Sequence, residues 1–336
     1  MKRRAFLLCG PALLLACGGA APVVATPKVR ETTLHLSPLT ELLQAPGMVW
    51  LVDAAPKHLR EAGLERAISR IVTGRAFDDF KGRNGGIDLR EMDEVMVASY
   101  GGVTVSGVRG LLDPGAVERA FTSRASAVDA RAIDHAPDVA EDRIVRVFGM
   151  LRGVRTQVCT LGRSAALLEE GTLGPVRAAV AFAQGKLKRT KPALHTRPLD
   201  RVAELLGDAP LRFFAPGPFE GEWSKAAGGI LAAATAFGAR AVMVEGTLMF
   251  SFVFTGTEAT SWDRDAEAVQ KRLSAAFDVV SQSDLGKLAR ADKPKVSATT
   301  RIDKDALWLH VGYDPALLAE GIHAALDAEI SEILAK

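Results

Sequence analysis

Two different spacings of apolar residues alternate along the chain after about residue 34. Residues 95–100 and 103–109 are rich in β-branched side chains and flank two glycines, which predicts a β-hairpin. Other stretches repeat apolar residues every three or four positions, as an amphipathic helix does, and residues 262–280 are the clearest example. Asp113-Pro114 and Asp314-Pro315 each place an N-cap residue before a proline, so we expect both pairs to begin helices.

The expected elements follow one order in both halves of the chain: strand, helix, hairpin, helix, strand pair and helix. Hairpins that lead into helices favour antiparallel sheets with helices packed on one face, an α+β architecture, over parallel winding. We therefore predict two similar lobes at residues 34–190 and 191–336, with the basic, proline-containing segment 186–198 as the linker. The two Asp-Pro helices carry apolar residues at matching offsets, which fits an internal duplication. A hairpin–helix building block shared by both halves is the alternative.

Three segments have more specific predictions. Residues 78–88 contain glycine and aspartate without the calcium-loop pattern, so we expect a plain loop. The Ala- and Gly-rich residues 226–238 are apolar nearly all round, which predicts a buried helix. Asp134-His135 with Asp138 lies between expected elements, and we interpret this cluster as a solvated loop rather than a metal site.

The start of the chain has a different pattern. A positive cluster at residues 2–4 precedes a mostly apolar run that ends at Ala16, and Cys17 follows directly. A charged start and a short apolar run predict a secretory signal peptide over residues 1–16, since a run of twelve residues is too short to cross a hydrocarbon core of ~30 Å as a helix.

Leu14-Leu15-Ala16-Cys17 resembles the lipobox of bacterial lipoproteins. In that family the cysteine receives a diacylglycerol on its sulfur and the signal is cut before it, and the new N-terminus is usually acylated as well. The resemblance implies a lipid anchor at Cys17, a flexible tether over residues 17–33 and a place in the cell envelope. Gly18, where an Asp would retain a Gram-negative lipoprotein at the inner membrane, favours the outer membrane. The alternative is an ordinary secreted protein cut after Ala16 or nearby.

Charge and cysteine content narrow the function classes. The 336 residues hold 42 basic and 40 acidic residues, and loss of the three basic residues of the signal leaves 39 against 40. This balance gives no support for nucleic-acid binding. Cys9 leaves with the signal and Cys17 carries lipid, so Cys159 has no partner for an internal disulfide. It lies in an expected strand, where we predict a small buried side chain.

No catalytic or metal motif stands out in the sequence. A phosphate-binding loop with its lysine, histidines at metalloprotease spacing and a Cys-x-x-Cys pair are all missing from it. The nearest nucleophile-elbow candidate, residues 162–166, lacks the second glycine and precedes an expected strand instead of a helix. We therefore assign no catalytic residue, metal ligand or cofactor, and we favour a protein that is not an enzyme.

Two apolar features remain as candidate sites. Phe250 and Phe252 lie on one face of a strand that is apolar on both faces, so this face is covered either by helices or by a cavity for a lipid or acyl chain. Phe214 and Phe219, with Trp223, lie in and after a Pro/Gly-rich loop that either contacts a partner or membrane or folds over the core.

These observations favour a membrane-anchored, non-enzymatic module that binds a partner protein or an apolar ligand. In general style it resembles uncharacterised envelope lipoproteins of Gram-negative bacteria. A hydrolase of envelope material whose site is not visible in the sequence is one alternative. A structural or assembly subunit is the other.

Overall fold

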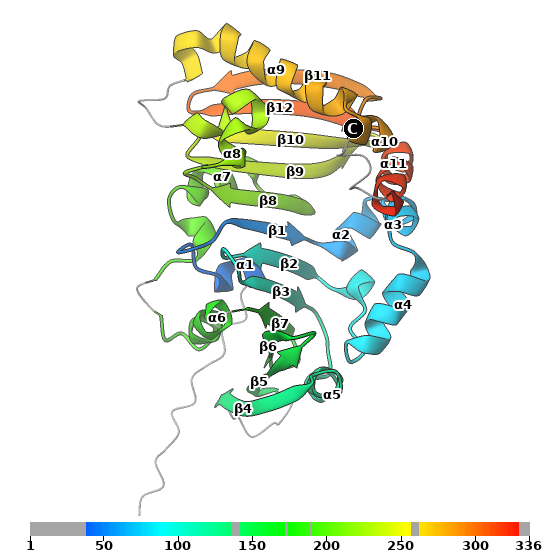
Figure 1. Ribbon diagram of the computed structural model, residues 1–336, viewed down its shortest axis with the longest axis vertical. Coiled ribbons are helices and arrows are strands. Elements are labelled where there is room, and N and C mark those ends of the chain that lie inside the picture. The colour runs from blue at the N-terminus through cyan, green and yellow to red at the C-terminus, as the bar shows by residue number, and fades with distance from the viewer. Residues whose placement is uncertain (1–37, 136–141, 172–173, 188–189, 257–261, 329–336) are drawn as a thin grey trace, which may run out of the picture. The chain divides into compact units, whose positions relative to one another are not determined.

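Among the residues that the structure describes, twelve antiparallel strands form a single sheet (Figure 1). The computed structural model describes residues 38–135, 142–171, 174–187, 190–256 and 262–328. The strands are β1 (Trp50–Ala54), β2 (Glu94–Ser99), β3 (Thr104–Arg109), β4 (Ala127–His135), β5 (Ile144–Leu151), β6 (Val154–Leu161), β7 (Ala165–Glu170), β8 (Leu211–Pro216), β9 (Ala236–Val244), β10 (Thr247–Thr255), β11 (Val296–Asp303) and β12 (Ala306–Tyr313). Their order across the sheet is β11-β12-β10-β9-β8-β1-β2-β3-β7-β6-β5-β4.

The helices lie on both faces and at one end of this sheet (Figure 1). They are α1 (Leu39–Leu42), α2 (Pro56–Glu61), α3 (Glu65–Ile71), α4 (Gly74–Arg83), α5 (Pro114–Thr122), α6 (Pro175–Ala183), α7 (Leu199–Leu206), α8 (Glu222–Lys225), α9 (Ala266–Gln282), α10 (Asp284–Leu288) and α11 (Pro315–Asp327). The helix starts at Asp113 and Asp314 are confirmed, because each aspartate side chain accepts a hydrogen bond from a backbone N–H of the first turn.

The predicted α+β class with antiparallel strands is confirmed, but the strands do not form two separate sheets. Strand β1 pairs with β2 on one side and with β8 on the other, so the ladder runs unbroken from one half of the chain into the other. All described residues belong to one compact unit that spans residues 32–336. Pairing β1 with β8 satisfies backbone groups that would be unpaired at two sheet edges, and a sequence pattern does not reveal this pairing.

The expected linker is also packed in its middle. Residues 193–195 form a 3₁₀ turn in which Ala193 and Leu194 are buried, and the backbone N–H of Ala193 donates to the carbonyl of Leu43. This turn joins the core beside α1, so the segment between the two halves is not simply solvated.

Helices cover the two faces of the sheet in different ways, whereas the sequence suggested helices on one face only. On the α7 face, α1, α6 and α7 enclose the largest core cluster, in which Leu51, Met96 and Phe214 are almost completely buried. On the opposite face, called the α9 face here, α9 covers β10–β12 and helices α4 and α5 cover the region of β2, β3, β6 and β7. Strands that are apolar on both sides need cover on both sides, which explains the two helical layers.

Strand order is alike in the two halves of the chain. In the first half β1, β2 and β3 form a meander, α5 follows, and the last strand, β7, returns to pair with β3. In the second half β8, β9 and β10 form a meander, α9 follows, and β12 returns to pair with β10. The first half carries two further strands, β4 and β5, beyond this common order.

Two local predictions were wrong. Most of the expected loop at 78–88 is helix α4, whose first turn is capped by the side chain of Thr73. The expected helix at 226–238 is instead a series of short turns that leads into β9, because Gly228 and Gly229 adopt positive φ angles of 67° and 82°. Alanine content favours a helix, but two adjacent glycines in this backbone region end it.

Candidate functional site

The residues singled out from the sequence lie in different environments. Cys17 and the tether of residues 17–33 lie outside the described residues. Phe214 is fully buried on the α7 face, and Phe219 is buried as well. Trp223 is 42% exposed and stacks on Phe219 with ring centroids 6.1 Å apart. The aromatic loop therefore folds mainly onto the core and presents one ring to solvent.

Phe250 and Phe252 belong to a row of aromatic rings on the α9 face. Neighbouring centroids lie 6.5 Å apart for Trp50 and Phe213, 5.7 Å for Phe213 and Phe237, and 6.4 Å for Phe237 and Phe252. Phe250 continues the row 6.3 Å from Phe252. These two side chains are half-buried and, like Phe277 of helix α9, pack against the buried cluster of Val311, Tyr313 and Leu318. Side chains of α9 and α11 thus belong to the same apolar clusters as this strand face.

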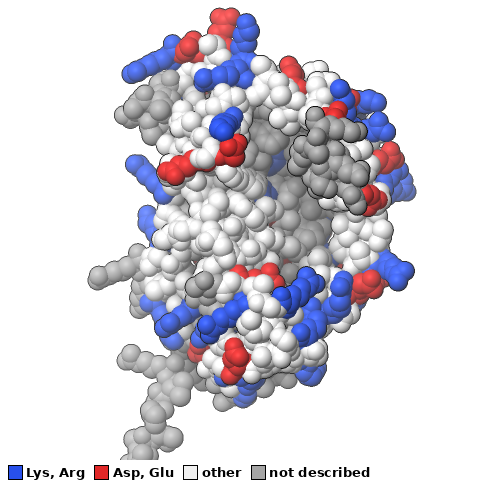
Figure 2. Space-filling view, viewed as in Figure 1, with Lys and Arg blue, Asp and Glu red and all other residues white. Residues whose placement is uncertain are grey.

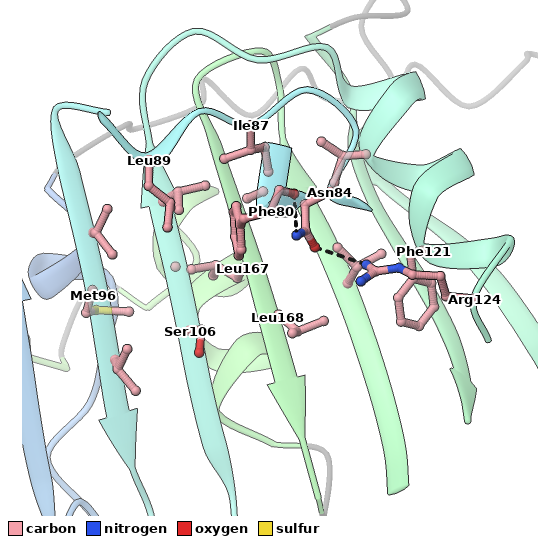
Figure 3. Close-up of a pocket in the computed structure, with 17 residues that line it drawn as sticks. Phe80, Asn84, Ile87, Leu89, Met96, Ser106, Phe121, Arg124, Leu167 and Leu168 are labelled. Atoms are coloured by element: carbon pink, nitrogen blue, oxygen red, sulfur yellow. Dashed lines mark hydrogen bonds between the residues drawn. The ribbon is translucent and has the colours of Figure 1, made fainter. Parts of the chain in front are cut away.

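An apolar pocket of about 290 Å³ lies on the same face of the sheet, in the first half of the chain (Figure 3). Its floor is formed by β2, β3, β6 and β7, and its cover by α4, α5 and the segment between α4 and β2. Two rows of paired residues make up most of the floor: Val97, Ser106, Leu168 and Val158 in one, and Val95, Val108 and Ala166 in the other.

The sequence explains why this part of the face leaves a space. One row of strand partners runs from Phe252 through Phe213 and Val52 to Ser106. Ser106 on β3 and Phe252 on β10 occupy equivalent places in this row, each on the second strand outward from the central β1–β8 pair. A phenyl ring fills the space under the helix layer in the second half, while a hydroxymethyl group leaves it open in the first.

The cover of the pocket depends on local signals in the chain. Thr73 and Asp113 cap the first turns of α4 and α5, and these helices contribute Phe80 and Phe121 to the pocket. Gly85 has a φ of 67°, and a Cβ atom there would lie 2.5 Å from the backbone of Ala116. Only glycine allows the turn after α4 to approach α5 this closely.

Polar groups of the pocket lie together at one side, where the covering helices end. Asn84 donates to the carbonyl of Phe80 at 2.8 Å and accepts from Nη2 of Arg124 at 3.0 Å (Figure 3). Arg124 Nε donates to the carbonyl of Ala120. Burial lowers the pKa of Arg124, and the nearby positive charges of Arg83 and Arg152 lower it further. The remaining lining residues are apolar except for Ser106.

Figure 2 shows the α9 face from the side used in Figure 1. The surface is hollowed between the region of α9 in the upper part of the view and the region of α4 and α5 in the lower part. Lys and Arg side chains outnumber acidic ones in the lower part. Arg124, which lines the pocket, is exposed at the surface.

The described residues give little support for a catalytic site. Ser251 Oγ lies 3.0 Å from Nδ1 of His310, a distance suited to a serine–histidine pair. Ser251 is 5% exposed, and the pKa of His310 is lowered by burial and then by Arg301 and Arg240. Among the described residues no carboxylate hydrogen-bonds to this histidine, so the third group that orients the imidazole in a triad is missing there.

Ionisable clusters elsewhere in the described part of the chain have structural roles. The carboxylate of Glu94 accepts hydrogen bonds from the backbone of Leu39 and Thr40, and Glu169 caps the start of α6 through Gly174 and Val176. Within the described ranges, no group of three or more His, Cys, Asp or Glu side chains is arranged to hold a metal ion.

The candidate metal cluster was also misread as a loop. Asp134 and His135 end strand β4, and both carboxylate oxygens of Asp134 accept from Arg146 at 2.6 and 2.8 Å. Asp138 lies outside the described residues. Cys159 is fully buried in β6, as expected, and burial raises the pKa of its thiol.

The pocket residues themselves were not identified from the sequence. The spacing of Phe77, Phe80 and Asn84 after the N-cap residue Thr73 was the available signal, but the glycine and aspartate content of residues 78–88 suggested a loop. No helix within the described segments is both long and apolar enough to cross a membrane.

Comparisons with known proteins give a fold and no family. No protein-family model and no curated protein matches the sequence. The fold is similar to the structure of crystal form III of TP0453, with a TM-score of 0.50 and 12% identity over 86% of this chain and 99% of that chain. Crystal form I of TP0453 gives a TM-score of 0.48 at 12% identity, over 87% of this chain and 98% of that chain. At this identity the similarity concerns the fold alone.

Proposed function

We propose that this chain is a membrane-anchored envelope lipoprotein that binds an apolar chain, such as the acyl chain of a lipid, between the sheet and helices α4 and α5. The observation that carries the proposal is the apolar pocket of about 290 Å³ over β2, β3, β6 and β7. Small-molecule sites are concave and mostly apolar, with a few polar groups at one side, and this pocket has that composition.

The size of the pocket limits the ligand. A methylene group takes up about the volume of a water molecule in the liquid, ~30 Å³, so the space of about 290 Å³ suits a chain of about ten carbons. Each methylene moved from water into such a site contributes about 0.8 kcal/mol. About ten of them give a gross gain of ~8 kcal/mol, enough for micromolar binding only when the costs of association are small.

A series of straight-chain alcohols from six to fourteen carbons tests the proposal without any contribution from charge. Calorimetry on the mature chain carrying Cys17→Ser is expected to show binding that tightens about fourfold per methylene. The gain should stop near ten carbons, where the pocket is full. Absence of binding, or affinity that rises without a limit at any chain length, would contradict a site of this size.

We further propose that Cys17 anchors the protein to the outer membrane. The lipobox-like residues 14–17 support this anchor. A position at a membrane also fits a pocket that binds a lipid chain. Two or more acyl chains on one cysteine give stable attachment, whereas a single chain does not. Intact-mass analysis of the protein from separated inner and outer membranes is expected to show the mass of a diacylglycerol and an N-linked acyl chain. An unmodified Cys17 thiol would refute the anchor.

We propose that the two halves of the chain arose by an internal duplication and that the pocket formed as their side chains diverged. The matching strand order of the two halves, with β7 beside β3 and β12 beside β10, supports it. If the two halves arose by duplication, the second half keeps aromatic side chains under α9. The first half has the small side chain of Ser106 at the position equivalent to Phe252, which leaves a space there. Superposition of the two halves is expected to align these four strands with α5 and α9, and a failure to do so would argue against duplication.

A further inference from the structure

Three arginines lie near the polar side of the pocket, and they come from three separate parts of the chain. Arg124 follows α5 and lines the pocket, Arg83 ends α4, and Arg152 lies in the turn between β5 and β6. Arg83 directly precedes Asn84, whose side chain accepts from Arg124, and the backbone N–H of Ser126 donates to the carbonyl of Met150 just before the turn that holds Arg152. All three side chains are exposed at the surface.

Several other cations of this region have acidic partners. Lys81 and Arg90 both pair with Asp88, and Arg131 pairs with Glu118. Among the described residues, no ion pair to a carboxylate involves Arg83, Arg124 or Arg152. Arg124 has only uncharged acceptors, the Asn84 side chain and the Ala120 carbonyl.

Like charges that gather without a counter-charge raise the free energy of the unliganded protein, and an anion placed among them relieves the repulsion. A guanidinium group also presents several N–H donors in a plane that matches a carboxylate or a phosphate. The Asn84–Arg124 hydrogen bond holds one guanidinium at the side of the apolar pocket, where the end of a bound chain would emerge (Figure 3).

We infer that the ligand is a single-chain amphiphile with an anionic head group, whose chain fills the pocket and whose head group lies among Arg124, Arg83 and Arg152. This inference rests on the proposed function and makes it more specific. The shared chemistry is an alkyl chain of about ten carbons that ends in a carboxylate, as in a fatty acid, or in a phosphate.

Four ligands with the same ten-carbon chain test the inference: decanoate, decyl phosphate, decanol and decyltrimethylammonium. Calorimetry at pH 8 and low ionic strength, with the mature Cys17→Ser chain, is expected to show the two anions binding at least fivefold more tightly than decanol. The cation should bind most weakly. The stronger of the two anions identifies the head group as carboxylate or phosphate, and 0.5 M salt should remove the preference for either.

Variants separate charge from packing. Arg83 and Arg152 do not line the pocket, so Arg83→Gln and Arg152→Gln are each expected to weaken decanoate and decyl phosphate about fivefold and to leave decanol within twofold of the unsubstituted chain. Arg124→Gln should weaken the two anions at least as much. Arg119→Gln is the matched control, because Arg119 lies on α5, is 75% exposed and has Asp113 as its charged neighbour.

The outcomes distinguish the two proposals. Equal binding of all four ligands would overturn the anionic head group and leave the apolar pocket in place. An Arg124→Gln variant that loses decanol as strongly as decanoate would assign Arg124 a packing role and overturn the inference as well. No binding of any ligand would overturn the proposed function itself.

Discussion

Substitution Ser106→Phe places a phenyl ring in the pocket at the position that Phe252 occupies in the second half of the sheet. Ser106 points into the pocket from β3, between its partners Val97 and Leu168 (Figure 3). The change leaves the charged side of the pocket untouched. It therefore tests the apolar space alone.

The expected effect follows from volume. Phenylalanine has seven side-chain carbons where serine has two heavy atoms, and five added atoms at ~30 Å³ each take up about half of the pocket of about 290 Å³. A ten-carbon chain then loses the burial of up to five methylenes, or ~4 kcal/mol at most. Rearrangement of the remaining chain recovers part of this, so we expect decanol to bind between ten and a thousand times more weakly. The chain length of tightest binding should fall to about five or six carbons.

Titration of the alcohol series into both proteins measures this shift directly. Ser297→Phe is the control, since it makes the same substitution at an exposed position of the edge strand β11, far from the pocket in the strand order. Thermal unfolding should show that Ser106→Phe is folded, with stability within about 2 kcal/mol of the parent, because the ring enters existing space.

A folded Ser106→Phe protein that binds decanol as tightly as the parent would refute the reasoning. It would mean that apolar chains bind elsewhere on the molecule. The row of half-buried rings from Trp50 to Phe250 would then be the surface to examine.

Three further predictions concern stability and reactivity. Gly321→Ala in α11 is expected to destabilise the fold by about 2 kcal/mol, because its Cβ would lie 2.3 Å from the backbone of Ala289, whereas Gly82→Ala in the last turn of α4, where a Cβ meets open space, should stabilise it by about 0.5 kcal/mol. Urea unfolding measures both, and equal effects would contradict the close approach of α11 and α10. Hydrogen bonds from Arg90 lower the pKa of Asp88 to about 2, so the stabilisation by this carboxylate is complete above about pH 4 and is lost as the pH falls toward 2. The advantage of the parent over Asp88→Asn in unfolding free energy, about 1 kcal/mol at pH 6, should disappear over that range; an advantage that persists at pH 2 would contradict this. Cys159 should resist thiol reagents at pH 8 until the protein unfolds, and peptide mass spectrometry that finds it labelled in the native protein would contradict its burial.

Local sequence signals were reliable where the cause of an element is local. The glycine pair between β2 and β3 and the Asp-Pro starts of α5 and α11 depend on residues that are neighbours in the chain, and the structure has them as expected. Helix α4 and the turns before β9 were misread for the converse reason. In both segments the composition of about ten residues predicts the wrong element. The deciding signal is one N-cap threonine before α4 and one pair of glycines before β9.

By itself the sequence determined the antiparallel α+β class, the buried Cys159, and the charge pattern that gives no support for nucleic-acid binding. It also carries the lipobox-like start on which the proposed anchor rests. Only the tertiary structure decided that β1 pairs with β8, which joins the two halves in one sheet. The same pairing sets Ser106 and Phe252 in one row and so shows where side-chain volume is missing. A cavity depends on the side-chain volumes of segments that lie far apart in the sequence, and no short stretch of sequence contains all of them.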